Sequence, residues 1–553
     1  MIAIGVFCAV VAAIGIYVAV GSDAISGRPT DGGHSAHARL SDHRHPQKAP
    51  VVNRTFTGAW GVESTATIAE NKLPGTSAWR IAPGVAPGFI EGFADHTYAS
   101  AGQQVGLYVS TSAPQFTVTG YRMGWYQGNG ARQIWQSADV DGVAQPPCPV
   151  DTTVNMVSCD NWSKSLSLTI PTTFPSGDYL FKLVGSGGQQ GYIMLTVVDP
   201  SSTATYVIMN RSLVEAAWND YGGFDFYQGT GPCVVDTDTY PVCNRARVVS
   251  FDRPYAEGNG SADFFSNEYP VIELAEEHGL DVTYDSDVTV DAVPGVLDGH
   301  RVLVSLGHDE MWTNPERVAV LSAFARGMNL AFLSGSALVR HARLQPSILG
   351  PDREVVDYRN DVDDPLSGKG DPMDVTGNTW SAPPADWSSS LLVGEIYSGY
   401  LEPDTPAAAF VVSDASSWIY SGTGLQNGST VPGIIESDID HVGPPGLTPA
   451  NVEVLGHSPV PLTDAYTNQG KWGPYTYSDL TYYTDPVSKA GVIDIGNNNW
   501  INALTPCGES SPTCPADVLA KITGNILHLF GQGPAGAIEP STGNLQSVMP
   551  QGS

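Results

Sequence analysis

The stretch RVLVSLGHDEMW, Arg301–Trp312, decides the fold that we expect for this chain. Its apolar run, residues 302–306, is closed by Gly307, which is typical of a buried parallel strand. Asn314–Glu316 then supplies an N-cap, a first-turn proline and an early acid, and these predict a helix. Residues 329–334 predict a second buried strand. A strand–helix–strand unit of this kind indicates an α/β sheet.

Three ionisable residues, His308, Asp309 and Glu310, directly follow the first of these strands. Ligands of open α/β sheets bind beyond the carboxyl ends of the strands, so these side chains are well placed for chemistry. The alternative is that His308 and Asp309 cap the loop while Glu310 is solvated, because strand-end loops are often polar.

Further strands and helices alternate on both sides of this unit. Residues 205–209 and 281–284 predict buried strands, 270–278 a short helix, 490–501 a strand and 519–530 an amphipathic helix. The pattern predicts a mostly parallel, doubly wound sheet. Other polar residues that follow strand ends should converge on the same edge: Asn210, Asp285, Asp287 and Ser336. Residues 346–486 are rich in Asp, Gly and Pro and predict a loop-heavy cover over that edge.

The region before residue 200 has a different pattern, with short alternating runs separated by Gly, Pro and Asn. These runs predict strands at 105–110, 116–121, 165–170, 179–184 and 191–198. Their spacing is typical of an antiparallel β-sandwich. The predicted domains are therefore an N-terminal segment at 1–22, a disordered linker at 23–55, an immunoglobulin-like β-sandwich at 56–200, an α/β domain at 201–535 and a disordered tail at 536–553.

The N-terminal segment contains an apolar run, residues 2–20, that nearly matches the roughly 20 residues needed to span a bilayer. It is longer than the apolar core of a usual signal peptide, so a retained anchor is favoured over a cleaved signal. Either interpretation predicts an exported protein, membrane-anchored or secreted. The four histidines of the following segment lie among small polar residues and predict a flexible tether rather than a metal site.

Six cysteines outside the apolar run form three pairs that are close in sequence: Cys148 with Cys159, Cys233 with Cys243, and Cys507 with Cys514. Six cysteines allow 15 connectivities, and we expect the local pairing. A metal site is disfavoured because the spacing of zinc motifs is absent. The cysteines thus also favour an oxidising compartment.

The chain is strongly acidic, with a net charge of -31 over 553 residues. A surface of this charge repels phosphate backbones, so no nucleic-acid partner is expected and the membrane would be contacted only through the N-terminal segment. The sequence is compatible with a homo-oligomer, and it does not decide whether a small partner subunit exists.

Several motifs resemble the large (beta) subunit of N,N-dimethylformamidase and related exported proteins. The matching stretches are NKLPGTSAW (Asn71–Trp79), YRMGWYQGNGAR (Tyr121–Arg132), AWNDYGG (Ala217–Gly223), SFDRPY (Ser250–Tyr255), GHDEMW (Gly307–Trp312), FLSGSALVRHARL (Phe332–Leu344), WIYSGTGL (Trp418–Leu425) and AGVIDIGNNNW (Ala490–Trp500). The resemblance implies a β-sandwich before a glutamine-amidotransferase-like α/β domain.

The same resemblance implies a ferric iron held by two tyrosines and a glutamate, which would deliver water to a small amide. The glutamate falls on Glu310 with His308 beside it, and one tyrosine falls on Tyr255. Glu436 corresponds to an acid that activates water. Two further positions would contact substrate, Asn219 and Ser336, the latter where the family has asparagine.

The second tyrosine position holds Trp218, whose indole cannot bind a metal. Only Tyr255 and Glu310 then remain as ligands, unless Tyr221 or His308 supplies a third. We therefore expect a hydrolase of small amides with a partly degenerate iron site, in which Trp218 contacts substrate. The alternative is a non-catalytic cell-surface protein that binds a ligand or partner. A serine hydrolase is disfavoured because no G-x-S-x-G pattern occurs.

Overall fold

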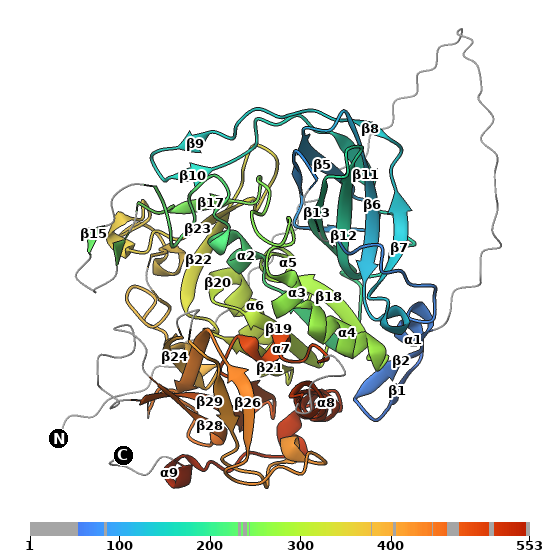
Figure 1. Cartoon of the computed structure of the whole chain (residues 1–553). Coiled ribbons are helices and arrows are strands. Elements are labelled where there is room, and N and C mark those ends of the chain that lie inside the picture. The colour runs from blue at the N-terminus through green and yellow to red at the C-terminus, as the bar shows by residue number, and fades with distance from the viewer. Residues whose placement is uncertain are drawn as a thin grey trace, which may run out of the picture. The chain divides into compact units, whose positions relative to one another are not determined.

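The computed structural model describes residues 53–81, 84, 86–230, 234–235, 241–242, 244–377, 379–401, 405–444, 446–461, 475–507 and 514–548. They form mixed α/β structure with many sheets and more strands than helices (Figure 1), as the sequence predicts. The expected anchor at 1–22 and nearly all of the expected linker lie outside these residues. None of the helices within these ranges is long and apolar enough to cross a membrane.

The central sheet has seven strands in the order β18-β14-β19-β21-β30-β29-β28, of which the first five are parallel. Four of these five fall where the sequence predicts a buried strand, and the fifth falls within 490–501. The bounds are β14 (Tyr206–Asn210), β18 (Val282–Ser286), β19 (Val302–His308), β21 (Asn329–Gly335), β28 (Glu453–Pro461), β29 (Tyr475–Thr484) and β30 (Gly491–Asp494).

Helices pack on both faces of this sheet because successive strand residues point to opposite sides. Val302 and Val304 of β19 belong to one core with helices α4 (Tyr269–Glu277), α7 (Asn499–Asn502) and α8 (Ala516–Phe530). Leu303 belongs to the other core with α5 (Asp287–Ala292) and α6 (Asn314–Ala325). Helix α6 begins one residue earlier than expected: Thr313 rather than Asn314 is its N-cap, in a capping box with Glu316.

The antiparallel strands β28 and β29 were not expected, because 346–486 reads as loop from its composition. Strand β28 lies at the sheet edge and contains Pro459 and Pro461, which are tolerated there because an edge strand needs fewer backbone donors. Its partner β29 is antiparallel to β30, which comes later in the chain. A local pattern cannot show such pairing.

The segment before residue 200 forms two sheets that share one hydrophobic core and are antiparallel except for the parallel pair β4 and β13. The larger has the order β4-β13-β12-β6-β7, with β8 paired to β6, and the smaller has the order β11-β5-β3. The bounds are β3 (Ile90–Ala94), β4 (Tyr98–Ser100), β5 (Gln104–Thr111), β6 (Gln115–Met123), β7 (Ala131–Gln136), β8 (Val140–Asp141), β11 (Leu166–Thr169), β12 (Gly177–Gly185) and β13 (Gln190–Val198).

Shorter elements complete the chain. They are β1 (Thr55–Thr57), β2 (Val62–Ser64), α1 (Thr65–Glu70), β9 (Val150–Asp151), β10 (Met156–Val157), α2 (Ser212–Trp218), β15 (Val234–Val235), β16 (Pro241–Val242), β17 (Val248–Ser250), α3 (Phe264–Asn267), β20 (Met311–Thr313), β22 (Arg340–Gln345), β23 (Glu354–Val356), β24 (Glu395–Tyr400), β25 (Ala408–Val411), β26 (Thr430–Ile435), β27 (Asp438–Val442) and α9 (Leu545–Val548). One-turn 3₁₀ helices also occur, for example at Trp418–Tyr420.

A buried ion pair joins the sandwich to the α/β sheet. Arg122 of β6 contacts Glu276 of α4 through two hydrogen bonds, at 2.6 and 3.0 Å. The same carboxylate accepts hydrogen bonds from Asn71 and Tyr284, each at 2.8 Å. This satisfied network ties β6, α4 and β18 together.

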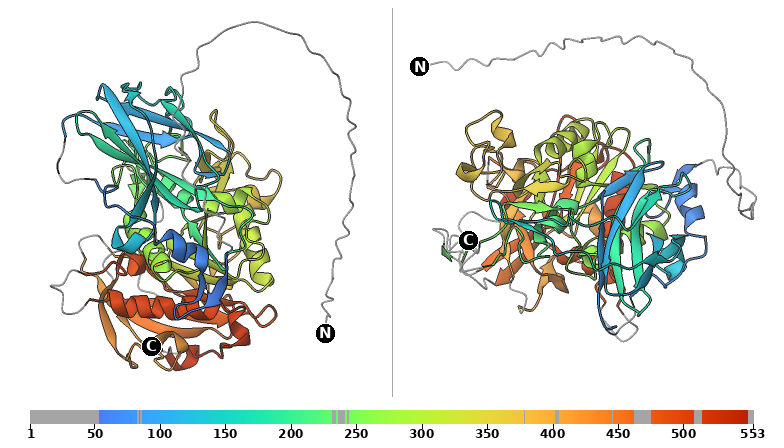
Figure 2. Two further views of the ribbon diagram at one scale, coloured as in Figure 1. Left: turned by 90° about the vertical axis from the view of Figure 1, so that its right-hand side faces the viewer. Right: turned by 90° about the horizontal axis from the view of Figure 1, so that it is seen from above.

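Tyr206 makes a second long-range connection. Its hydroxyl accepts a hydrogen bond from the Val62 amide at 3.0 Å and donates one to the Leu527 carbonyl at 2.8 Å. Figure 2 shows the blue N-terminal strands beside the red helix α8, and Trp60 packs there against Gly524. Residues that are far apart in the sequence therefore meet at β14, the strand of the central sheet that comes first in the chain.

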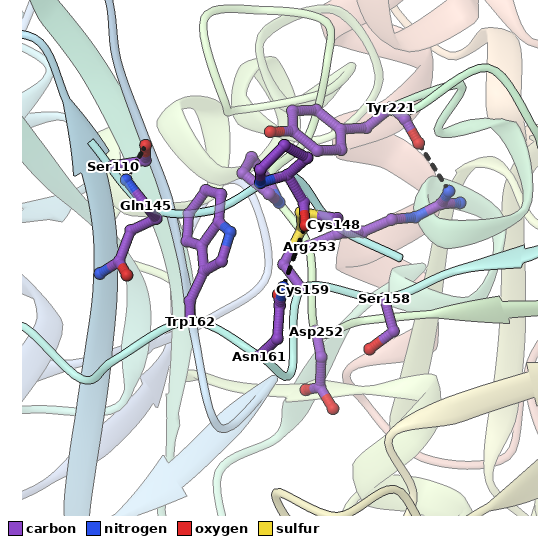
Figure 3. Close-up of a disulfide and its surroundings, with 12 residues drawn as sticks. Ser110, Gln145, Cys148, Ser158, Cys159, Asn161, Trp162, Tyr221, Asp252 and Arg253 are labelled. Carbon is purple, nitrogen blue, oxygen red and sulfur yellow. Dashed lines mark hydrogen bonds between the residues drawn. A yellow bond between two sulfur atoms is a disulfide. The ribbon is translucent and has the colours of Figure 1, made fainter. Parts of the chain in front are cut away.

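Two of the predicted disulfides are confirmed, Cys148–Cys159 and Cys507–Cys514. Cys159 is fully buried, and its amide donates to the carbonyl of Asp252 at 2.6 Å. Figure 3 shows this disulfide beside Arg253, which donates to the Tyr221 carbonyl. The first disulfide thus holds a sandwich loop against the loop that carries Arg253.

The third predicted disulfide, which would join Cys233 and Cys243, is not confirmed. Both Cys233 and Cys243 lie outside the residues that the structure describes. The bond between these two cysteines therefore stays a prediction. Peptide mapping under non-reducing conditions would test it, and a bond from Cys243 to any cysteine other than Cys233 would contradict the local pairing.

We expected residues 536–553 to be a disordered tail, but the structure describes this segment as far as Val548, including helix α9. Ser541 donates to Thr484 or accepts from it at 3.2 Å, and it accepts from Asn451 at 2.7 Å. Leu545 and Val548 of α9 pack on the sheet core. The low apolar content of this segment did not predict an ordered structure, because polar contacts rather than a hydrophobic stripe hold most of it in place.

Candidate functional site

The candidate site lies where the direction of the central sheet's connections reverses. Strand β14 has β18 on one side and β19 on the other, so the chain moves outward in both directions from it. A crevice forms at such a point beyond the carboxyl ends of the strands. His308 is the last residue of β19 and is paired in register with Gly335 of β21.

The turn after β19 is fixed by the segment that follows β21. The Glu310 carbonyl accepts from the amides of Val339 and Arg340, at 3.1 and 2.8 Å, and the Asp309 amide donates to the Ser334 hydroxyl at 3.0 Å. Burial raises the pKa of Asp309 to about 6. Asp309 therefore holds the turn from inside, while its neighbours face the opening.

His308 is held between two carboxylates. Its Nε2 lies 3.4 Å from an oxygen of Glu310 and 3.6 Å from an oxygen of Asp438. Neither contact has hydrogen-bond geometry, so this buried nitrogen has no hydrogen-bond partner among the residues that the structure describes. Asp438 accepts from the Asn498 amide at 3.0 Å and is hydrogen-bonded to the phenol of Tyr397. The imidazole is thus available for a molecule that enters the site.

The phenol next to Glu310 belongs to Tyr227, which the sequence did not single out. Its hydroxyl hydrogen-bonds to the same Glu310 oxygen that His308 approaches. The Trp218 indole stacks on one face of its ring at 3.7 Å, and the Arg359 guanidinium lies 4.6 Å from its centre. Burial, with the negative charge of Glu310, raises the pKa of Tyr227 well above its usual value.

A cavity of about 380 Å³ opens beside these residues, and we call it the Trp218 cavity. Its lining includes Trp218, His308, Glu436 and Asp438. Trp218 is 42% exposed, which is unusual for an indole, and its ring lies 5.8 Å from that of His308. The structure therefore brings three of the predicted site residues, Trp218, His308 and Glu436, to one cavity, with Glu310 directly behind His308.

Tyr255 lies elsewhere. It lines a smaller cavity of about 50 Å³ with Glu215, Arg253 and Glu268, and burial raises its pKa. No contact joins it to Glu310 in the part of the chain that the structure describes. Tyr221 does not approach Glu310 either, because its hydroxyl donates to Glu91 at 2.8 Å.

The two remaining predicted substrate contacts, Asn219 and Ser336, do not line the Trp218 cavity. Asn219 is buried, and its side chain donates to the Pro254 carbonyl at 2.9 Å and accepts from the Ala256 amide at 3.1 Å. Ser336 has a φ of 56° and directs its amide at Asp440, a carboxyl whose pKa burial raises to about 7. Both residues shape the loops around the site.

The site also contains residues that sequence reasoning missed, namely Tyr227, Asp438 and Tyr397. Asp438 comes two residues after Glu436 in the stretch GIIESDID, and this short acidic spacing was a usable signal. Neither Tyr227 nor Tyr397 had such a signal, because each is far from Glu310 in the sequence and is separated from it by loops.

Within the described ranges, no three or more His, Cys, Asp or Glu side chains are arranged to hold a metal ion. An ion at Glu310 would need the Tyr227 phenol as a further ligand.

In α/β proteins, polar cavities beyond the strand ends are common places for small molecules to bind. A family model described as "N,N-dimethylformamidase beta subunit-like, C-terminal" matches residues 117–514, well over half of the chain. The chain belongs to this family.

Other comparisons add little. No curated protein matches. One solved structure, a Paenibacillus sp. cycloisomaltooligosaccharide glucanotransferase complexed with cycloisomaltoheptaose, has 12% identity and a TM-score of 0.13. The match covers 23% of this chain and 17% of that one, and at this score it says nothing about fold or function.

Proposed function

We propose that this protein hydrolyses a small amide in the Trp218 cavity. Membership of the dimethylformamidase-like family supports the reaction class. The observation that carries the proposal is the His308 imidazole: its Nε2 is buried, hydrogen-bonds to no described residue and lies between Glu310 and Asp438. An imidazole beside carboxylates can take a proton from water, because the negative charges stabilise the imidazolium that forms.

Each group around His308 has a distinct task in this proposal. Glu310 and Asp438 orient the imidazole from two sides, and Asn498 fixes the Asp438 carboxylate. Glu436, which also lines the cavity, would receive or return a proton at the departing amine. Trp218 covers the side of the cavity next to Tyr227 and provides an apolar surface for the acyl or N-alkyl group.

The iron that the family resemblance implies fits this site through hard oxygen donors. Glu310 would hold the ion as expected, and Tyr227, already in contact with it, would take the place of the expected Tyr255. When bound, the ion would polarise the amide carbonyl and acidify water. Two protein ligands hold an ion weakly, so we expect partial occupancy.

The test is amide turnover by the purified full chain supplied with ferric iron. Release of amine from formamide, acetamide and dimethylformamide would be measured. Glu310→Gln should lower kcat/KM by about 100-fold or more, since it removes a charge at the proton-transfer group. Asp139→Asn, at an exposed position of the sandwich, is the matched control and should change nothing. Failure of the iron-supplied protein to hydrolyse any amide would contradict the proposal.

A second candidate function is ligand binding without catalysis. It is favoured by Trp218, because an exposed indole at a position where a metal ligand is expected suits binding rather than chemistry. This alternative would apply if the cavity binds small amides but does not hydrolyse them.

Two broader expectations stay proposals. We infer export, with the N-terminus as anchor or signal, and the two disulfides support it because such bonds persist in oxidising compartments. We also propose that the two-sheet unit is immunoglobulin-like and that the α/β unit is glutamine-amidotransferase-like, supported by their strand orders.

A further inference from the structure

The Trp218 cavity is lined by acidic side chains. Six of its lining residues are Asp or Glu: Asp220, Asp225, Glu257, Asp263, Glu436 and Asp438. Asp225 is turned toward the backbone and accepts from the Tyr227 amide at 2.6 Å. The carboxylates of Asp220, Glu257 and Asp263 are on exposed residues at the opening, where no ion pair to a described residue neutralises them. The negative charge therefore faces whatever enters.

No Lys or Arg occurs among the described residues that line this cavity. The charge of Arg253 acts on Asp220 and Asp225, and that of Arg211 acts on Asp263. The Arg253 guanidinium donates to the main-chain carbonyls of Asn219, Tyr221 and Phe224, at 2.7 to 2.9 Å, so it binds backbone instead of a carboxylate. These two arginines offset the negative charge only from a distance, since neither lines the cavity.

Two further features point to an organic cation. The exposed Trp218 indole offers a π face, and quaternary and primary ammonium groups bind such faces at about 6 Å or less. Asn498 also lines the cavity, and its side-chain amide donates to the Asp438 carboxylate at 3.0 Å, which holds this negative charge at the cavity.

We infer that the Trp218 cavity takes a cationic amide, in which an ammonium group lies against Trp218 and the acidic opening while the amide reaches His308. This inference rests on the proposed function and names the substrate class of the same site. The size agrees, because about 380 Å³ falls within the range of roughly 300–1,000 Å³ typical of sites for larger small molecules. A five-atom neutral amide would leave most of this space empty.

The test compares two amides of the same shape that differ only in charge: betaine amide, which carries a trimethylammonium group, and 3,3-dimethylbutanamide, its neutral carbon analogue. Their dissociation constants for the full chain would be measured by calorimetry at low and high salt. We expect betaine amide to bind at least tenfold more tightly at low salt, with a smaller preference at high salt because screening weakens surface charge interactions.

Substitutions in the cavity test whether the preference for betaine amide arises there. Trp218→Leu and the double variant Glu257→Gln/Asp263→Asn should each reduce the preference for betaine amide several-fold, whereas the control Asp139→Asn should retain it. Equal binding of the two amides, tighter binding of the neutral one, or no binding of either overturns the inference.

Turnover of the same two amides separates this inference from the proposed function. A cation preference without hydrolysis would support the inference and contradict the hydrolase. Hydrolysis of both amides without a cation preference would support the hydrolase and contradict the inference.

Discussion

At the scale of single residues, the contact between Tyr227 and Glu310 changes how residue 218 is understood. From the sequence alone, a tryptophan at a position where a metal ligand is expected indicates that the metal site has been lost. The structure shows a phenol from further along the same loop reaching the glutamate, with the indole stacked on it. The indole thus supports a neighbouring phenol.

Replacing Tyr227 by phenylalanine tests whether this phenol holds iron. Tyr227→Phe keeps the ring that stacks on Trp218 but removes the oxygen, so in protein supplied with excess ferric iron we expect loss of the iron–phenolate absorption that the wild type then shows, and at least about tenfold weaker iron binding. Absorption spectra and elemental analysis check this. The matched control is Tyr221→Phe, whose phenol in the same loop contacts Glu91 and should leave both readouts unchanged. Retained absorption in Tyr227→Phe would rule this phenol out.

The variant Trp218→Tyr addresses the missing ligand directly. We expect wild-type protein to carry little iron, and we expect the variant to gain iron and visible absorption, because residue 218 lies beside Tyr227 and His308. A phenolate is a hard anionic oxygen ligand, unlike an indole. Stoichiometric iron in purified wild-type protein would show that the site needs no second tyrosine.

Sequence reasoning located His308 and Glu310 because both follow a strand whose apolar run is unmistakable. Glu436 was located by resemblance and lies at the same cavity. Tyr255 was expected at Glu310 but lines another cavity, since the loop after Ser250 turns toward the sandwich. Loop paths of this kind depend on long-range contacts that no local pattern records.

At the scale of secondary-structure elements, the helices and strands of the strand–helix–strand unit follow from periodicity and capping, whereas β28 and β29 do not. The first are set by residues close in sequence, such as Thr313 and Glu316 in the cap of α6. The second need a partner strand that follows in the chain. The contact between sandwich and sheet was likewise unpredictable, because Arg122 and Glu276 are distant in sequence.

The Arg122–Glu276 pair should stabilise the junction between β6 and α4. Glu276→Gln leaves a buried guanidinium without its counter-charge, so we expect a loss of about 3–5 kcal/mol in the free energy of unfolding. Denaturant titration measures it. Asp298→Asn breaks an exposed ion pair with Arg326 and is the control, with an expected cost below about 1 kcal/mol. Equal costs for the two variants would show that burial does not matter at this junction.

At the scale of the whole molecule, buried acids should make stability depend on pH. Burial raises the pKa of Asp178 to about 7, of Glu215 to about 7 and of Asp285 to about 8. A raised pKa means that the folded protein binds the proton more tightly than the unfolded chain. The resulting stability is complete below the unfolded pKa, about 4, and is lost as pH rises through about 7 to 8.

We therefore expect the free energy of unfolding to fall between about pH 6.5 and about pH 8, above the range in which the lowered pKa values of His278 and His341 oppose the trend. Acids whose pKa is lowered, such as Asp95 and Asp364, are already ionised across this range and do not oppose the trend. Asp285→Asn should flatten the slope and raise the melting temperature most at the alkaline end, whereas Asp139→Asn should not. Thermal unfolding at several pH values measures this, and a stability that rises with pH would contradict it.

The hydroxyl of Tyr206 joins residues from the beginning, middle and end of the chain through Val62 and Leu527. During synthesis, the acceptor at Leu527 leaves the ribosome last, long after Val62 and Tyr206 have emerged. The strands that carry Val62 and Tyr206 must then wait for helix α8 before this connection can form. Until α8 has emerged, the surface that it covers in the folded protein is open to chaperones and proteases.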